Sequence, residues 1–265
     1  MREIALKIGR PTPLTAIATE PTNFDSSKAA VIILNSGVMH HIGTCRISVK
    51  IARELADSGL LALRFDLSGI GDSEPRRGTA SFQESSSAEV TEVMDYLQQK
   101  KGINRFIVYG LCSGADASYE VARTDKRIIG MIQIDAYCYA NWKSYLRHYA
   151  PRALKPGAWL SFIARILGRQ KANISTSDSV DDDNIEMPSY IRELPPRKEI
   201  SDGLKSIISR NICIYNIFTG DNAKEYNYTN QYLDTFSELD FNGRLTVDFF
   251  QELDHIITCP KYQKL

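Results

Sequence analysis

The sequence predicts an α/β protein in which a mainly parallel β-sheet is covered by helices on both faces. Short apolar runs rich in β-branched residues recur along the 265-residue chain, and stretches with helical periodicity separate them. The runs are continuously hydrophobic, as in strands that are buried on both faces. Because 43% of the residues are hydrophobic, the chain can bury one large core with a small accessory subdomain.

The first half of the chain alternates predicted strands and helices. Residues 30–34 read Ala-Val-Ile-Ile-Leu and predict a buried strand, which ends at the turn Asn35-Ser36-Gly37. A helix is expected over residues 44–57, because its apolar residues recur at helical spacing and Gly59 follows. By the same criteria we expect a strand at 60–65, a helix at 85–99, a strand at 105–109 and a helix that ends near Arg123.

The second half supplies further strands and an insertion. Strands are expected at 129–134, 212–218 and 245–250. Between the first two, aromatic and basic helical residues are followed by a polar stretch, which indicates a cap with a long loop. The predicted organisation is an α/β core formed by residues 1–136 and 211–265, with a helical cap inserted at 137–210.

Composition argues against several classes of function. The 32 lysines and arginines balance 32 aspartates and glutamates, so no nucleic-acid partner is expected. We predict a cytoplasmic protein with no membrane span, because no long apolar run and no secretory signal are present. Five scattered cysteines predict free thiols. No metal site is expected, since the acidic triplet 181–183 lacks a ligand pattern, and no cofactor, since Gly69 and Gly71 lack a third glycine at dinucleotide spacing.

The strongest chemical signal is Gly110-Leu111-Cys112-Ser113-Gly114, between a predicted buried strand and a predicted helix. A nucleophile in this context sits on a strained strand-to-helix turn, and small residues flank it because a Cβ would clash with backbone. Cys112 is therefore the candidate nucleophile, and the helix N-terminus beneath it favours a thiolate. Two alternatives stay open: Cys112 is a buried inert thiol, or Ser113 is the nucleophile in a register that loses the opening glycine.

Several of these segments resemble the α/β-hydrolase superfamily: the turn at 35–37, residues 64–66 with 69–73, the motif at 110–114, and Asp254-His255. More narrowly, residues 37–73 resemble hydrolases associated with bacterial exosortase and exopolysaccharide loci. The resemblance extends from about residue 29 to 255 and excludes the cap. It implies the α/β-hydrolase fold and an oxyanion hole built from the backbone N–H groups of Ser113 and of Val38 or Gly37.

His255 is the candidate general base, because it follows the last predicted strand and keeps the superfamily's chain order of nucleophile, acid and histidine. Three carboxylates are candidates for the acid of the triad. Asp221, in the turn after the strand at 212–218, is the first choice, with Glu225 and Asp135 as alternatives. The family's common spacing places an aspartate three residues after the glycine of that turn, and this chain has Ala223 there.

The residues around this constellation suggest what it binds. His40 and His41 lie beside the predicted oxyanion turn and are candidates for substrate contact, or else are surface residues. Trp142 and other aromatic residues of the cap favour an apolar acyl group, although such residues also serve packing.

The sequence thus predicts an acyl-transfer enzyme, either a thioesterase, an esterase or an acyltransferase. It would use a Cys112–His255–Asp221 triad and a covalent acyl-cysteine intermediate on a small-molecule or carrier-bound acyl substrate. The alternative from another class is a non-catalytic binding or scaffold protein with a degenerate site. The short chain after His255 predicts an exposed sheet edge, which is open to a homodimer.

Overall fold

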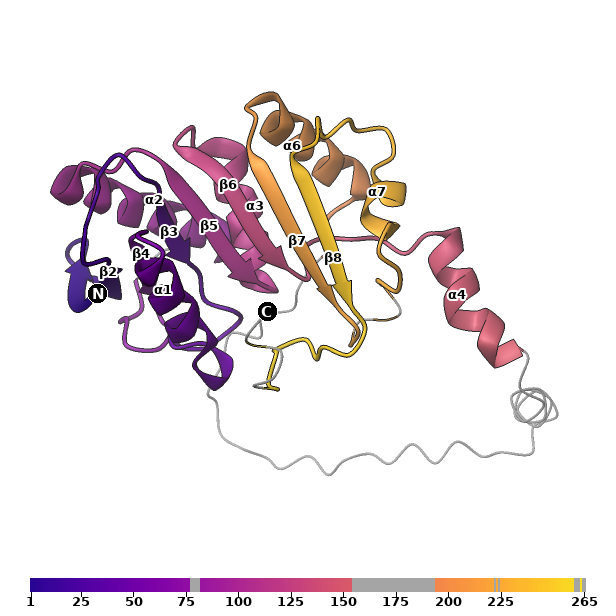
Figure 1. The fold of residues 1–265 in the computed structure, drawn as a ribbon, viewed down its shortest axis with the longest axis horizontal. Coiled ribbons are helices and arrows are strands. Elements are labelled where there is room, and N and C mark those ends of the chain that lie inside the picture. The colour runs from indigo at the N-terminus through magenta and orange to yellow at the C-terminus, as the bar shows by residue number, and fades with distance from the viewer. Residues whose placement is uncertain (77–81, 154–193, 222, 224, 260–262, 264–265) are drawn as a thin grey trace.

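A mixed sheet of eight strands forms the centre of the molecule (Figure 1). The computed structural model describes residues 1–76, 82–153, 194–221, 223, 225–259 and 263. The strands lie in the order β1-β2-β4-β3-β5-β6-β7-β8. Their bounds are β1 (Arg2–Ile8), β2 (Leu14–Glu20), β3 (Ala30–Ile33), β4 (Ala62–Phe65), β5 (Phe106–Leu111), β6 (Ile128–Ile134), β7 (Cys213–Thr219) and β8 (Leu245–Phe250).

The sheet is parallel from β4 to β8, which confirms the predicted fold class. At one edge, β1 pairs antiparallel with β2, and β2 pairs antiparallel with β4. No element was predicted before residue 30, so β1 and β2 were missed. Their signal is present in β1, where Ile4, Leu6 and Ile8 are more buried than the residues between them, as in a strand with one exposed face.

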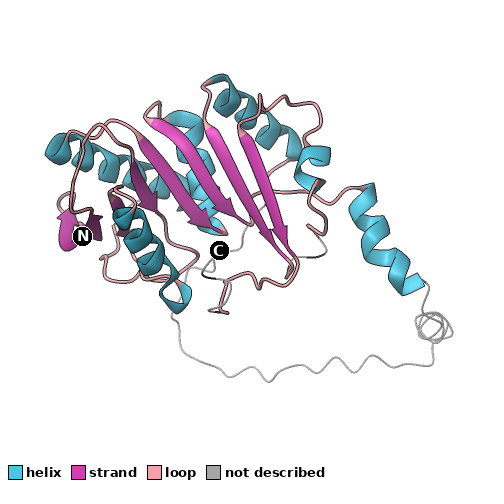
Figure 2. Cartoon of the chain, viewed as in Figure 1, coloured by secondary structure: helices cyan, strands magenta, loops and turns pink. Residues whose placement is uncertain are grey.

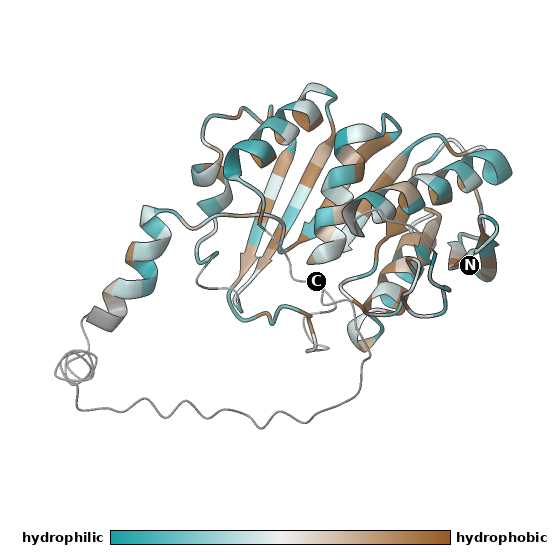
Figure 3. Ribbon diagram, turned by 180° about the vertical axis from the view of Figure 1, so that it is seen from behind, coloured by the Kyte–Doolittle hydropathy of each residue, from teal (hydrophilic) through white to brown (hydrophobic). Residues whose placement is uncertain are grey.

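Helices cover both faces of the sheet (Figure 2). Because successive strand side chains point to opposite faces, Val31 and Ile33 belong to a small core with Ala52 of α1, while Ile32 belongs to a larger core with Leu97 of α2. Figure 3 shows the strands as the most hydrophobic part of the chain. The helices are α1 (Ile47–Asp57), α2 (Phe82–Lys101), α3 (Ser113–Thr124), α4 (Trp142–Ala153), α6 (Arg197–Ser209) and α7 (Gln231–Thr235), with a 3-10 turn η1 (Thr44–Arg46).

The predicted cap contains two described helices with different surroundings. Helix α6 packs as part of the core: Ile200 is buried in the larger core, and its carbonyl accepts a hydrogen bond from the Tyr119 hydroxyl at 3.1 Å. Helix α4 projects away from the sheet (Figure 1), and its first residue, Trp142, is 71% exposed. Residues 154–193, with the acidic triplet, lie outside the described residues. The division into core and cap stays a prediction.

The two edges of the sheet are β1 and β8. A partner at the β8 edge stays a prediction. Among the residues that the structure describes, every helix is too short or too polar to cross a lipid bilayer.

Candidate active site

Cys112 lies at the sharp turn between β5 and α3. Its backbone has φ 54° and ψ −117°, a conformation that side-chain-bearing residues rarely adopt. The turn is held from both sides: the N–H of Cys112 donates to the carbonyl of Ile134 at 3.0 Å, and its carbonyl accepts from the N–H of Asp116 at 3.1 Å. A half-buried thiol therefore stands at the carboxyl end of the parallel strands, the side on which open α/β sheets bind ligands.

The glycines of the motif are required by close backbone contacts. A Cβ on Gly110 would lie 2.0 Å from the carbonyl oxygen of Gly114, and a Cβ on Gly114 would lie 2.4 Å from the carbonyl oxygen of Asn35. Real Cβ atoms do not approach backbone this closely. The predicted reason for the flanking glycines therefore holds in this chain.

Gly110→Ala is expected to lower the free energy of unfolding by about 3 kcal/mol, the upper end of the usual cost of overpacking. Urea denaturation followed by circular dichroism measures the change. Gly130→Ala in the neighbouring strand β6 is the matched control, because the atom nearest to its new Cβ is a side-chain carbon 3.4 Å away. Equal losses in the two variants would contradict a steric requirement at Gly110.

His255 reaches this thiol from the loop after β8. Its side chain interacts with that of Cys112, and both residues line one pocket. On the other side of the ring, Nδ1 lies 2.5 Å from Oδ2 of Asp135. Asp135 directly follows β6, has φ 52° and is 4% exposed. Thr219 holds the same carboxylate in place, because its N–H and its hydroxyl each donate to an oxygen of Asp135 at 2.8 Å.

Asp221 occupies a different position from the one expected of it. Its Oδ2 accepts a hydrogen bond from the backbone N–H of His255 at 2.8 Å, so it contacts the histidine's main chain. The carboxylate against the imidazole is that of Asp135, an alternative in the sequence analysis. The reason lies in the strand order: β6 is the neighbour of both β5 and β7, so its end lies between Cys112 and the Asp221 turn. Glu225 lines the nearby pocket.

Hydrogen bonds with Asp135 and then with Cys112 raise the pKa of His255 from its ordinary 6.5 to about 10, against the opposing effect of burial. Because the folded-state pKa is raised, the stability contributed by the charged ring is fully present below pH 6.5. It is lost as the pH rises through about 10.

We expect NMR titration of the His255 imidazole to give a midpoint near pH 10 in the folded protein. In Asp135→Asn the midpoint should fall toward 6.5, because the main interaction that raises the pKa is removed. His255→Gln identifies the resonance by its loss. A midpoint that is the same in the wild type and in Asp135→Asn would contradict this origin of the shift.

The predicted oxyanion turn is tied to the nucleophile turn. The N–H of Gly37 donates to the hydroxyl of Ser113 at 2.6 Å, and Ser113 is 2% exposed. Its side chain is thereby used to hold the turn and is not among the residues that line the pocket at Cys112. This arrangement speaks against Ser113 as the nucleophile. The side chain of Val38, the next residue, is 74% exposed.

A pocket of about 390 Å³ opens at Cys112 and His255. Its walls are partly apolar, from β7 and the segments after β6 and β7, and partly acidic. The lining residues are Cys112, Asp135, Ala136, Tyr137, Cys138, Leu194, Phe218, Asp221, Glu225, Tyr226 and His255.

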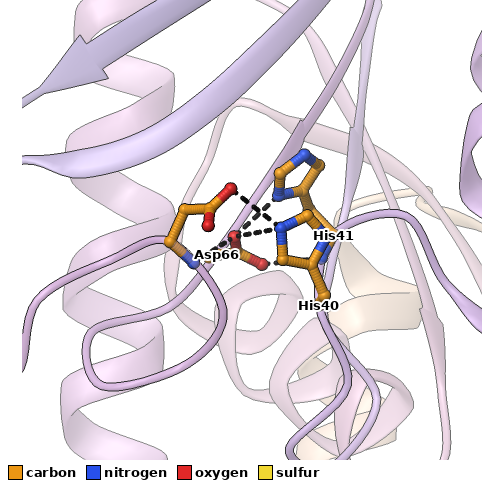
Figure 4. Close-up of side chains that lie close together, drawn as sticks. His40, His41 and Asp66 are labelled. Atoms are coloured by element: carbon orange, nitrogen blue, oxygen red, sulfur yellow. Dashed lines mark hydrogen bonds and ion pairs between the residues drawn. The ribbon is translucent and has the colours of Figure 1, made fainter.

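The two predicted substrate contacts lie elsewhere. Nε2 of His40 contacts Oδ2 of Asp72 at 2.9 Å, and its neighbour His41 contacts the buried Asp66 (Figure 4). Trp142 stands on the exposed surface of α4. Neither His40 nor Trp142 is among the residues that line the pocket at Cys112, so a role for them in substrate binding stays a prediction.

Comparison with solved structures finds similar folds at low sequence identity. An alpha-beta serine hydrolase homologue from Coxiella burnetii is 12% identical, with a TM-score of 0.57 and 99% of this chain and 94% of that chain covered. A Pyrococcus furiosus esterase is 13% identical, with a TM-score of 0.57 and coverages of 98% and 84%. A thermophilic esterase from Thermogutta terrifontis is 13% identical, with a TM-score of 0.53 and coverages of 100% and 96%.

Sequence comparison identifies the family. No curated protein sequence matches the chain. A family model does match: residues 26–196, well over half of the chain, fit the Hydrolase_4 model, described as serine aminopeptidase, S33. The match includes β3 to β6 and the turn that carries Cys112. With its parallel sheet and its strand-to-helix nucleophile turn, the chain belongs to the Hydrolase_4 family of α/β-hydrolase enzymes.

Proposed function

We propose that this hydrolase cleaves ester or thioester bonds through a covalent acyl-Cys112 intermediate, with His255 as the proton carrier and Asp135 as the acid that orients it. The observation that carries the proposal is the unbroken chain of contacts from the Cys112 thiol through the imidazole of His255 to the carboxylate of Asp135. Nucleophile, base and orienting acid in hydrogen-bond reach are the requirements of covalent acyl transfer.

The raised pKa of His255 favours a thiol over a hydroxyl as the nucleophile. With a pKa of about 10, the imidazole is protonated at neutral pH. An imidazolium cannot remove the proton of a serine hydroxyl, but beside Cys112 it stabilises a thiolate, which is itself the nucleophile. The cysteine is thus matched to its histidine, although the family is described as serine aminopeptidases.

The reaction follows from this pairing. The Cys112 thiolate attacks the carbonyl carbon of the substrate, and the negative oxygen is stabilised by the N–H groups of Ser113 and Val38. Val38 is preferred to Gly37 because the N–H of Gly37 already donates to Ser113. The imidazolium of His255 then gives its proton to the leaving alcohol or thiol as the carbon–heteroatom bond breaks. A water molecule, deprotonated by the neutral imidazole, attacks the thioester and releases the acid and Cys112.

The pocket supports a compact, largely apolar acyl group. Its volume of about 390 Å³ is near the lower end for small-molecule sites. Phe218 and Tyr226 form part of the wall, and their stacked rings have centroids 3.7 Å apart. The acyl group could also be transferred to an amine or thiol instead of water, and the substrate could be bound to a carrier. Formation of a homodimer and membership of the exosortase-associated hydrolases stay predictions from the sequence.

The test is intact-mass spectrometry after incubation with a panel of short and medium-chain acyl thioesters and activated esters, together with assays of product release. We expect a mass increase equal to one acyl group, located at Cys112 by peptide mapping, and turnover of at least part of the panel. Neither adduct nor turnover with any member would favour the non-catalytic binding or scaffold protein.

A further inference from the structure

Two histidines and two aspartates gather beside the oxyanion turn. His40 and His41 follow β3, Asp66 follows β4, and Asp72 lies in the next turn. One ligand atom from each of the four side chains lies within 4.8 Å of all the others. Figure 4 shows the imidazole rings of His40 and His41 directed at Asp66. None of the four lines the pocket at Cys112, so the cluster is separate from the proposed reaction centre.

The cluster concentrates negative charge. Asp66 is fully buried, and its ion-pair contacts are with His40 and His41, while Asp72 contacts His40. Among the described residues, no lysine or arginine forms an ion pair with either aspartate. The Asp66 carboxylate also accepts hydrogen bonds from the side-chain amide of Asn35 and from the backbone N–H groups of His41 and Asp72. Buried carboxylates are normally paired, hydrogen-bonded or bound to a metal, so a buried carboxylate beside two imidazoles is a fitting place for a cation.

The donor atoms and their spacing suit a transition metal. Nε2 of His40 lies 2.9 Å from Asp72 Oδ2 and 3.5 Å from Asp66 Oδ2, and Nδ1 of His41 lies 2.7 Å from Asp66 Oδ2. Neighbouring donors in a tetrahedral zinc site are roughly 3.3–3.6 Å apart, given bonds of about 2.0–2.2 Å. Small side-chain movements would therefore centre an ion among the four atoms. Two imidazole nitrogens with carboxylates favour zinc or a similar metal over magnesium or calcium, which prefer oxygen alone.

We propose that His40, His41, Asp66 and Asp72 bind a divalent transition metal, with zinc as the best match. The ion would replace the present contacts between the ring nitrogens and the carboxylates. Asn35 links the cluster to the turn, because its side-chain amide donates to Asp66 Oδ1 at 3.1 Å and to the carbonyl of Met39 at 2.7 Å. A metal bound here would fix the segment that carries Gly37 and Val38. Its role would be structural.

Titration of the chelator-treated full-length protein with zinc and with cobalt tests the site. Calorimetry should give one zinc per chain, with a dissociation constant of about 10 μM or lower. The melting temperature should rise by about 5 °C at a hundredfold excess over that constant. Cobalt should give the visible absorption of a tetrahedral complex without the near-ultraviolet band of a cobalt–thiolate bond. Magnesium should leave the melting temperature unchanged.

The variants Asp72→Asn and His40→Gln test the ligands. Their side chains are 65% and 33% exposed, so neither change removes a core residue. Both should lose the zinc-dependent rise in melting temperature and bind zinc at least about tenfold more weakly. Asp57→Asn, which changes an exposed aspartate on α1, and Cys45→Ser, which removes the nearby exposed thiol, should bind zinc like the wild type. If the wild type did not bind zinc, or if Asp72→Asn bound it equally well, the proposal would be overturned. The four residues would then only hold the two turns together by hydrogen bonds.

Discussion

Cys112→Ala should reduce kcat/KM for any ester or thioester substrate by about 10⁴-fold or more, because no atom is left to form the acyl intermediate. The fold should be retained, because the thiol is half-buried and its replacement by alanine removes only a small volume. Steady-state kinetics measures the loss, and intact-mass spectrometry should show that the acyl adduct has disappeared. Ser113→Ala is the control for the alternative in which Ser113, and not Cys112, is the nucleophile. Its effect should be smaller, because it removes only the hydrogen bond that holds Gly37.

Cys112→Ser makes the same prediction more specific. Serine is the nucleophile of many α/β-hydrolases, but it needs a neutral imidazole to take its proton. Asp135, the main cause of the raised pKa of His255, stays in place in this variant. The serine variant should therefore be at least about 10³-fold less active than the wild type near pH 7, and its deficit should shrink toward pH 10. A serine variant as active as the wild type would contradict the pairing of a thiolate with a protonated His255. A Ser113→Ala variant as inactive as Cys112→Ala would contradict the choice of Cys112 over Ser113 as the nucleophile.

The buried strands could be predicted because each carries its signal within a few residues. The strand at 245–250 was predicted with the bounds of β8, and the strand at 129–134 within one residue of β6. β1 and β2 were missed because short, partly exposed antiparallel strands have a weak local pattern, and their pairing depends on the distant β4. The contact of α6 with Tyr119 of α3 could not be predicted either, because it joins segments far apart in the sequence.

In the candidate site, too, local features could be predicted and contacts between distant segments could not. Cys112 as candidate nucleophile and the reason for its flanking glycines were predicted from a local motif, and in the structure Cys112 and His255 line the same pocket. The acid did not follow, because Asp135, Asp221 and Glu225 all come after predicted strands, and sequence order does not say which carboxylate faces the ring. Two features could have favoured Asp135: it comes at the end of the strand before the insertion, and Thr219 can donate to it from the next strand.

The proposed metal cluster was not predicted from the sequence, for a related reason. His40 and His41 were singled out for their place beside the predicted oxyanion turn, whereas Asp66 and Asp72 lie in segments that carry the family resemblance. Each pair has an ordinary explanation alone. They become one site only because β3 and β4 are adjacent parallel strands, so the segments that follow them meet at the same edge of the sheet.

Asp135→Asn should lower kcat/KM by about 10²- to 10⁴-fold, whereas Asp221→Asn should lower it by less than about tenfold. The carboxylate of Asp135 both orients the ring through Nδ1 and supplies the charge that keeps it protonated. An asparagine amide there can favour the wrong tautomer of the imidazole. Asp221 contacts only the backbone N–H of His255 among the hydrogen bonds of the described residues, so its loss leaves the ring in place.

The pH dependence separates the two aspartates further. In Asp135→Asn the pKa of His255 should fall, so the ring becomes neutral at a lower pH and the imidazolium that stabilises the Cys112 thiolate is lost earlier. The alkaline limit of activity should therefore move to lower pH in Asp135→Asn and stay unchanged in Asp221→Asn, as measured by pH profiles of kcat/KM. If instead Asp221→Asn showed the larger loss and the shifted limit, Asp221 would be the acid, and the contact between Asp135 and the ring would serve structure alone.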